Sequence, residues 1–454
     1  MIEKLRRILS KVDAVYSDIR YEKRQDITIR FNNREIAQVS SSTTDGYVIR
    51  VLAGGGLSAT AFTREQDAEK AIELTVSGAK IMGRMRKTPV KLAAVDAVRD
   101  SFTPSLKEDP LKVSIDEKIE LLKKYNEIPL SRDEIVNTIL GYGDVIRDKW
   151  FVSSEGSEIE ERLITSLLQG DIKSRRGNVI QNVRISAGGS DGFHNIREQE
   201  DNFEQRTKIA LDLLDAVPVK GGCYNCVLNP MMAGVFTHEA FGHFSEADLV
   251  EALPTMRAKM QLGSQLGSDI LNIVDDATQP GQLGFYKYDD EGVTVRKVEL
   301  MKNGVLTGRL HSRRTAAEFG EPVSGHNIAE DFRFAPIIRM GNIFIAAGES
   351  NLEEMLMQLD EGIYLLDPKG GQTAGENFTF GAQYGYEVKN GKQGKMLRDI
   401  NVSGNLYRTL KNIRAIGDQV ELSKVGGCGK GQTNIRSCLG GPHVLIDNLM
   451  IGGN

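Results

Sequence analysis

Two histidines and a glutamate lie close together in the stretch NPMMAGVFTHEAFGHFSEAD, which runs from Asn229 to Asp248. His238 and His243 flank Glu239 in the pattern HExxxH. Imidazole nitrogens are common zinc ligands, and a carboxylate beside them can act as the general base of a zinc hydrolase. These residue types therefore predict a metal site with hydrolytic chemistry.

The motif is expected to lie on a helix, because Asn229 is a favourable N-cap and Pro230 would occupy the first helical position. Successive residues of an α-helix are about 100° apart, so side chains five positions apart diverge by about 140°. A regular helix therefore cannot turn His238 and His243 toward one ion. We predict a one-residue bulge or a helix end between Ala240 and His243, eased by the glycine before His243.

A catalytic zinc ion usually has three protein ligands, so two histidines leave the site incomplete. Cys428 is favoured as the third, because its glycine neighbours allow a close backbone approach and the charge of Lys430 would favour the thiolate. Glu246 is the next alternative; together with Asp248 it could instead accept hydrogen bonds from the ligand histidines. The other possible ligands are His194, His311, His326 and His443.

The composition narrows the class of protein and its compartment. The 454 residues suggest two or three domains, and 57 basic against 62 acidic residues give a net charge of −5. No basic block marks a nucleic-acid surface, so we expect no nucleic-acid partner. Four cysteines are too few for a disulfide framework, which favours a cytoplasmic location. No segment resembles a membrane span, so no membrane association is expected.

Capping boxes predict two helices in the first half of the chain, among short strands. Thr63 with Gln66 would open a helix over residues 64–82. Ser114 with Glu117 would open another that ends near Tyr125. These helices need a sheet to cover their apolar faces.

Later segments predict mainly antiparallel sheet. From residue 151 the pattern indicates a meander with turns at Glu155-Gly156, Gly170-Asp171 and Arg176-Gly177. A helix over 198–216 and a strand over 224–228 then lead into the histidine motif. Asn-Gly pairs, the strongest short hairpin signal, predict two further hairpins at 303–304 and 390–391.

These elements predict an α+β protein with two domains. Residues 1–215 would form an N-terminal domain of layered helices and strands. Residues 216–454 would form a C-terminal, largely antiparallel β domain that carries the zinc-binding helix.

Several motifs resemble those of the TldD/PmbA family of metalloproteases, in particular its metal-bearing TldD-type members. The resemblance runs nearly end to end. It is carried by HEAFGH with the acids that follow it, YKYDDEG at 286–292, PIIRMGN at 336–342, GENFTFGAQYGYEVKNGK at 375–392 and CGKGQ at 428–432. Two departures are Gly341, where many members have threonine, and CGKGQ, which is one residue shorter than the commoner CGKxGQ.

The resemblance implies a zinc metallopeptidase. His238, His243 and Cys428 would bind the Zn2+ ion, and Glu239 would activate a zinc-bound water. Family members act as homodimers, or as heterodimers with a metal-free homologue, on short or unfolded peptides held in extended form. We expect the peptide to bind as an added β-strand. The alternative is a non-catalytic peptide-binding or regulatory subunit with a structural metal site.

Overall fold

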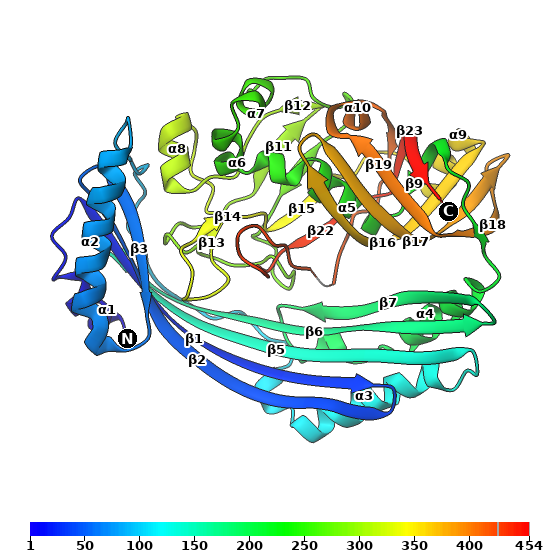
Figure 1. The fold of residues 1–454 in the computed structure, drawn as a ribbon, viewed down its shortest axis with the longest axis horizontal. Helices are drawn as coiled ribbons and strands as arrows, with labels where there is room; N and C mark the ends of the chain where they lie inside the picture. The colour runs from blue at the N-terminus through cyan, green and yellow to red at the C-terminus, as the bar shows by residue number, and fades with distance from the viewer. Residues whose placement is uncertain (425, 454) are drawn as a thin grey trace.

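The computed structural model describes residues 1–424 and 426–453 and shows an α+β fold built on several sheets. A long, curved sheet from the first half of the chain lies under a compact C-terminal half, with its concave side toward it (Figure 1). Most strand pairs in both halves are antiparallel. The predicted fold class is therefore confirmed.

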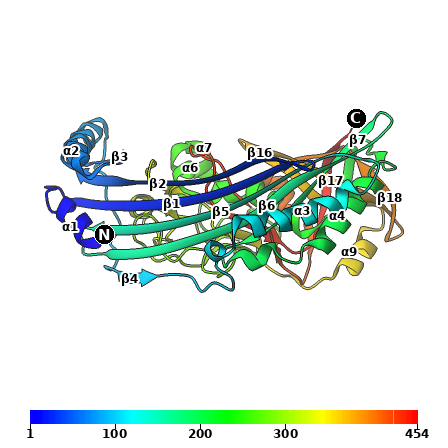
Figure 2. The same ribbon diagram turned by 90° about the horizontal axis from the view of Figure 1, so that it is seen from below.

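The N-terminal sheet has the strand order β3-β2-β1-β5-β6-β4, with β7 paired to β6. Four of its strands, β1, β2, β5 and β6, are long and run along most of the molecule, whereas β3 and β4 are short and lie near one end (Figure 2). The bounds are β1 Tyr16–Asn32, β2 Glu35–Ala53, β3 Gly56–Phe62, β4 Arg99–Phe102, β5 Ile135–Ser153, β6 Glu158–Arg176 and β7 Val179–Gly189.

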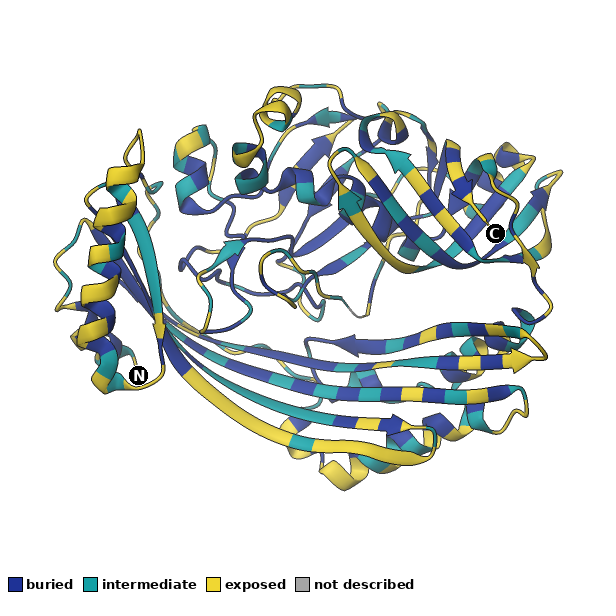
Figure 3. Cartoon of the chain, in the orientation of Figure 1, coloured by how far each residue is buried: buried dark blue, intermediate teal, exposed yellow. Residues whose placement is uncertain are grey.

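Four helices cover the two ends of this sheet. At one end α1 (Ile2–Leu9) and α2 (Ala68–Met85) bury apolar side chains against β1, β2 and β3. At the other end α3 (Ile115–Leu130) and α4 (Glu200–Asp212) pack on β5, β6 and β7. The outward faces of these helices are exposed (Figure 3). Of the helices in the described ranges, none is long and apolar enough to cross a membrane.

Local signals in this half were right at some positions and wrong at others. The Ser114 hydroxyl accepts a hydrogen bond from the Glu117 main-chain N–H, which is half of the predicted capping box. The Glu117 side chain pairs with Arg197 instead, and the helix runs to Leu130 rather than ending near Tyr125. The Thr63 capping box does not form, because a 3-10 turn precedes α2 and its N-cap, Asp67, makes no side-chain cap bond. The turn predicted at Gly170 is also wrong, since β6 runs straight through it. A side chain at Gly170 would lie 2.6 Å from the Ile139 carbonyl oxygen, so this glycine permits close strand packing.

The C-terminal half contains two larger sheets. In the first, the pairings of β9, β23, β19, β17 and β16 close a ring, because β16 pairs with both β9 and β17. The bounds are β8 Val217–Pro218, β9 Gly222–Leu228, β16 Gly362–Ala374, β17 Asn377–Lys389, β18 Lys392–Arg398, β19 Ile400–Asn405, β20 Ile413–Ile416 and β23 Val444–Gly452.

The second larger sheet has the order β12-β11-β10-β15-β22-β21, and β13 pairs separately with β14. Both predicted Asn-Gly hairpins are confirmed, between β11 and β12 and between β17 and β18. The bounds are β10 Ile273–Asp275, β11 Val298–Lys302, β12 Val305–Leu306, β13 Asn327–Ile328, β14 Ile337–Ile338, β15 Asn342–Ile345, β21 Glu421–Leu422 and β22 Cys438–Gly441. Short helices surround the sheets: α6 Ala247–Ala252, α7 Pro254–Lys259, α8 Arg313–Phe319, α9 Leu352–Leu359 and α10 Leu406–Lys411.

Helix α5 (Pro230–Ala240) lies between the two sheets and is buried almost all round. A side chain at Gly234 would lie 2.6 Å from the Gly440 main-chain nitrogen on β22. On the opposite side, a side chain at Gly371 of β16 would lie 2.8 Å from Glu239 Cγ. Glycines thus allow strands to touch the helix on both sides, which fixes the position of the HExxxH motif.

Buried ion pairs join the long sheet to the C-terminal half. Arg50 of β2 lies 2.9 Å from Glu291, and Arg20 of β1 lies 3.1 Å from Asp290. All four side chains are at most 5% exposed. Buried pairs of this kind add little net stability, but breaking one costs several kcal/mol, so they fix how the two halves fit together.

Candidate metal centre

The end of α5 sets the direction of His243. The helix begins as predicted, with the Asn229 side chain accepting a hydrogen bond of 2.9 Å from the Met232 main-chain N–H. It ends at Ala240, and a 3-10 turn over Gly242–Ser245 follows. The predicted helix end between Ala240 and His243 is therefore confirmed, and it turns the second imidazole back toward the first.

Gly242 serves this turn in a way that the sequence did not reveal. A side chain here would lie 2.2 Å from Met340 Sδ and 3.0 Å from Ile343 Cδ1. The turn packs directly on the core, and the absence of a side chain allows this contact.

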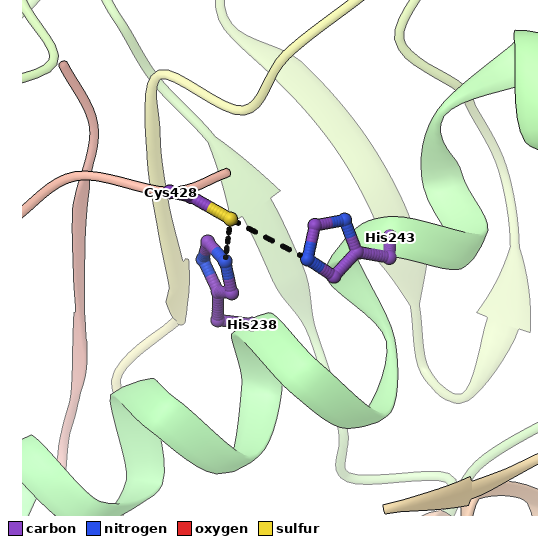
Figure 4. Close-up of side chains that lie close together, drawn as sticks. All are labelled: His238, His243 and Cys428. Carbon is purple, nitrogen blue, oxygen red and sulfur yellow. Dashed lines mark hydrogen bonds between the residues drawn. The ribbon is translucent and has the colours of Figure 1, made fainter. Parts of the chain in front are cut away.

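Three donor atoms come together beside this turn (Figure 4). His238 Nε2 lies 3.0 Å from Cys428 Sγ, which in turn lies 3.5 Å from His243 Nε2. One donor atom from each residue lies within 4.8 Å of the others. His238 and Cys428 are 190 positions apart, so the cluster depends on the tertiary fold.

The segment that carries Cys428 is a small hairpin between β21 and β22. Cys428 and Ile435 pair through two main-chain hydrogen bonds of 3.1 and 3.3 Å. Gln432 anchors the hairpin, donating to the Ala335 carbonyl at 2.8 Å and accepting from the Glu330 N–H at 2.8 Å. The short CGKGQ loop is therefore held from both sides.

The electrostatics of the cluster favour a thiolate. Burial opposes ionisation of Cys428, but hydrogen bonds from His238 and His243 lower its pKa to about 5. Burial lowers the pKa of His243, but hydrogen bonds to Cys428 and Glu246 outweigh burial and raise it. Without a metal, the Cys428 thiolate accepts hydrogen bonds from the imidazoles, and His243 tends to hold a proton. A bound metal cation would take the place of these protons.

Lys430, whose charge was expected to favour the thiolate, pairs with two acids. Its ammonium group lies 2.9 Å from Asp248 and 3.1 Å from Glu246. These are the two acids that follow the motif. The largest effects that lower the pKa of the thiol are the hydrogen bonds from the imidazoles.

Glu246 stands behind His243. Its fully buried carboxylate lies 3.2 Å from His243 Nδ1, on the side of the ring opposite to the cluster. Burial raises its pKa, but the bond to His243 and the charges of Lys430 and Arg339 lower it below its usual value. The buried Arg339 guanidinium lies 3.8 Å from the same carboxylate, and sequence reasoning missed it, although it stands within the PIIRMGN motif.

The remaining histidines are engaged elsewhere. His326 Nε2 lies 3.0 Å from Asp275, His311 Nε2 lies 2.9 Å from Glu321, and His443 Nε2 lies 3.0 Å from Tyr364. His194 Nε2 lies 3.6 Å from Asp191. Within the described ranges, only Cys428 among the alternatives meets both motif histidines in one cluster.

The spacing of the donors suits a tetrahedral transition metal. With bonds of about 2.0 Å to nitrogen and about 2.3 Å to sulfur, a tetrahedral ion holds these atoms about 3.5 Å apart. The two nitrogen–sulfur distances of 3.0 and 3.5 Å are close to that value. The residues therefore fit a metal ion with one open position.

Glu239 and the three donors line one cleft of about 680 Å3. The Thr373 hydroxyl of β16 lies 2.9 Å from Glu239 Oε2 and 2.6 Å from the main-chain oxygen of the same residue. Thr373 was not singled out in the sequence, since nothing local distinguishes it. Its contact fixes the carboxylate at the side of the cleft.

Three family models together match most of the chain: PmbA/TldA metallopeptidase domain 1 at residues 17–80, the central domain at 108–215 and the C-terminal domain at 221–453. The chain belongs to the TldD/PmbA family. The resemblance noted in the motifs is therefore confirmed, and the family is one of metalloproteases.

Curated TldD/PmbA relatives span nearly the whole chain. A metalloprotease of Methanocaldococcus jannaschii is 35% identical over 94% of this chain and 95% of its own. A zinc metalloprotease TldD homologue of Saccharolobus solfataricus is 32% identical over 98% of both chains. The crystal structure of TldE from Thermococcus kodakarensis, 18% identical, has the same fold with a TM-score of 0.78 over 99% of both chains.

Proposed function

We propose that this protein is a zinc metallopeptidase for short or unfolded peptides, with His238, His243 and Cys428 as the zinc ligands. The observation that carries the proposal is the gathering of their donor atoms within 4.8 Å of one another, in a cleft that Glu239 also lines. Two imidazoles and a thiolate form a donor set that suits zinc.

When bound, zinc would lower the pKa of a water molecule and polarise the scissile carbonyl. Glu239 would take the proton of the attacking water and pass it to the leaving amine. The contact with Thr373 supports this role, because it holds the carboxylate in one position at the side of the cleft. A base that is already positioned loses less freedom when the substrate binds.

The substrate would bind along β16. Residues 363–365 of this strand lie between β9 and β17, whereas residues 371–374 pair with β17 alone. The other edge of this second part borders the cleft through Gly371, Gln372 and Thr373. An extended peptide would gain main-chain hydrogen bonds at such an edge with little demand on its sequence.

Metal analysis combined with a peptidase assay tests the function. We expect about one zinc ion per purified chain, hydrolysis of an unfolded peptide, loss of hydrolysis on chelation and recovery when zinc is restored. Zinc without turnover would favour the non-catalytic subunit. Hydrolysis that survives complete removal of the metal would contradict the proposal.

Changing Glu246 to glutamine is expected to weaken zinc binding by about 10- to 100-fold, the usual effect of losing an outer hydrogen-bond partner of a ligand. Glutamine keeps the shape but loses the charge that fixes His243 Nδ1. Competition with a chelator measures the affinity. Asp248→Asn is the matched control, because Asp248 pairs with Lys430 and not with His243. Equal affinity in Glu246→Gln and wild type would refute this role.

Three finer proposals concern location, partner and domains; only the partner rests on the family resemblance. The protein would work in the cytoplasm, and its partner would be a second copy or a metal-free homologue. The division into residues 1–215 and 216–454 would separate a supporting domain from the one that binds zinc.

A further inference from the structure

The cleft has two unlike walls. One is rich in glycine: Gly370 and Gly371 of β16, Gly375 just after it, and Gly427 and Gly429 of the Cys428 hairpin line it together with Gln372 and Thr373. The rest of the lining includes the segment that runs from the 3-10 turn through α6 and α7. The apolar side chains that line the cleft from this segment, here called the apolar wall, are Phe244, Leu249, Leu253 and Met256.

Leu253 is the most accessible member of the apolar wall. It is 47% exposed and joins α6 to α7 in an extended conformation, which the following Pro254 favours. Met256 packs partly on the main core, and Phe244 is buried beneath. Covering an exposed leucine with another apolar group lowers the free energy of the complex, because apolar surface is removed from water.

The charged groups that line the cleft are not available to form an ion pair with a charged side chain of the substrate. Apart from the three donors, the charged residues of its lining are Glu239 and Lys430. Lys430 is already paired with Asp248 and Glu246, and Glu239 is the proposed base. Among the described residues that line the cleft, therefore, no free cation would receive an acidic side chain, and no other carboxylate would receive a basic one.

The two walls together determine how a bound substrate peptide would be oriented. At Gly371 the direction of a Cβ is already filled by Val235 and Glu239 of α5, so this part of β16 packs on the helix. Residues 371–374 pair with β17 alone, and their other edge is the one at which a peptide main chain would bind. In an extended peptide, alternate side chains point to opposite sides. One set would then face the apolar wall, directly beside the donor cluster.

We propose that the apolar wall is a specificity pocket that binds a large aliphatic or aromatic side chain of the substrate next to the scissile bond. This inference rests on the proposed peptidase function, whose substrate it defines more closely. Apolar pockets typically discriminate by about 10- to 200-fold for each methylene that they bury.

The test uses the zinc-loaded protein and labelled peptides that differ only at one central residue, leucine, aspartate or lysine. We expect kcat/KM and the equilibrium binding affinity to be at least about tenfold higher for the leucine peptide than for the aspartate peptide. Leu253→Lys should remove this preference and favour aspartate. Leu253→Met should keep it, as should the control Met357→Lys, since Met357 is 62% exposed on α9, outside the cleft lining.

Each outcome separates this inference from the proposed function. Hydrolysis with no preference among the three peptides would overturn the specificity pocket and leave the peptidase intact. Preferential binding of the leucine peptide without hydrolysis would support the pocket and contradict the peptidase. If Leu253→Lys instead turned a dimer into monomers and left the preference unchanged, the apolar wall would be a subunit interface and the inference would be wrong.

Discussion

Glu239→Gln is expected to lower kcat/KM for peptide hydrolysis by about 100- to 10,000-fold, the usual contribution of a general base. Glutamine has nearly the same shape and can keep the contact with the Thr373 hydroxyl, which lies 2.9 Å from Glu239 Oε2. It cannot accept the proton of the attacking water. The variant should therefore bind zinc and peptide normally and fail in the chemical step.

Three measurements on the same preparation check this: zinc content, affinity for an uncleaved peptide and the rate of hydrolysis. Glu353→Gln on α9 is the matched control, because it removes an exposed carboxylate outside the cleft lining and should leave all three unchanged. Full activity in Glu239→Gln with zinc bound would assign the base to another group. Loss of zinc would mean that Glu239 serves the metal rather than the proton transfer.

Cys428→Ala is expected to abolish stable zinc binding, and with it hydrolysis. Its sulfur lies 3.0 Å from His238 Nε2 and 3.5 Å from His243 Nε2, so the substitution removes one of the three proposed metal ligands. The affinity should fall by more than the roughly 10- to 100-fold that an outer partner contributes. Cys428→Asp, which restores an anionic donor, should recover part of it.

Chelator competition and metal analysis measure this loss. Substitution with cobalt adds a second readout, because absorption from thiolate–cobalt bonding should be present in wild type and absent in both variants. Cys223→Ala is the control, since Cys223 is an exposed residue of β9 that lies outside the cluster. If Cys428→Ala bound zinc as tightly as wild type, the proposed ligand set would be wrong.

Local sequence signals were accurate where the structure depends on neighbouring residues. The Asn229 cap, the break after Ala240 and both Asn-Gly hairpins were predicted from residues within a few positions, although the turn after Ala240 also packs on Met340 and Ile343. They failed where distant packing prevails. Gly170 sits inside β6 because strands on both sides leave no room for a side chain, and its neighbours in sequence carry no sign of this.

The candidate site divides in the same way. The spacing of His238, Glu239 and His243 predicted a metal and a base, together with a break in the helix between the histidines. From the residues alone Cys428 remained one of several alternatives, and only the family resemblance implied it. The pairing of Lys430 with Asp248 and Glu246 was not predicted, because it depends on how the Cys428 hairpin packs against the segment after α5.

By itself, therefore, the sequence determined the chemistry of the motif, the ends of α5 and the α+β class, since these depend on residue type and on short-range backbone geometry. The tertiary structure alone decided that the Cys428 hairpin meets α5, that the β16 edge borders the cleft and that α6 and α7 supply its apolar wall. The physical reason is that these contacts join segments far apart in the chain. Such contacts form only when both sheets pack around one buried helix.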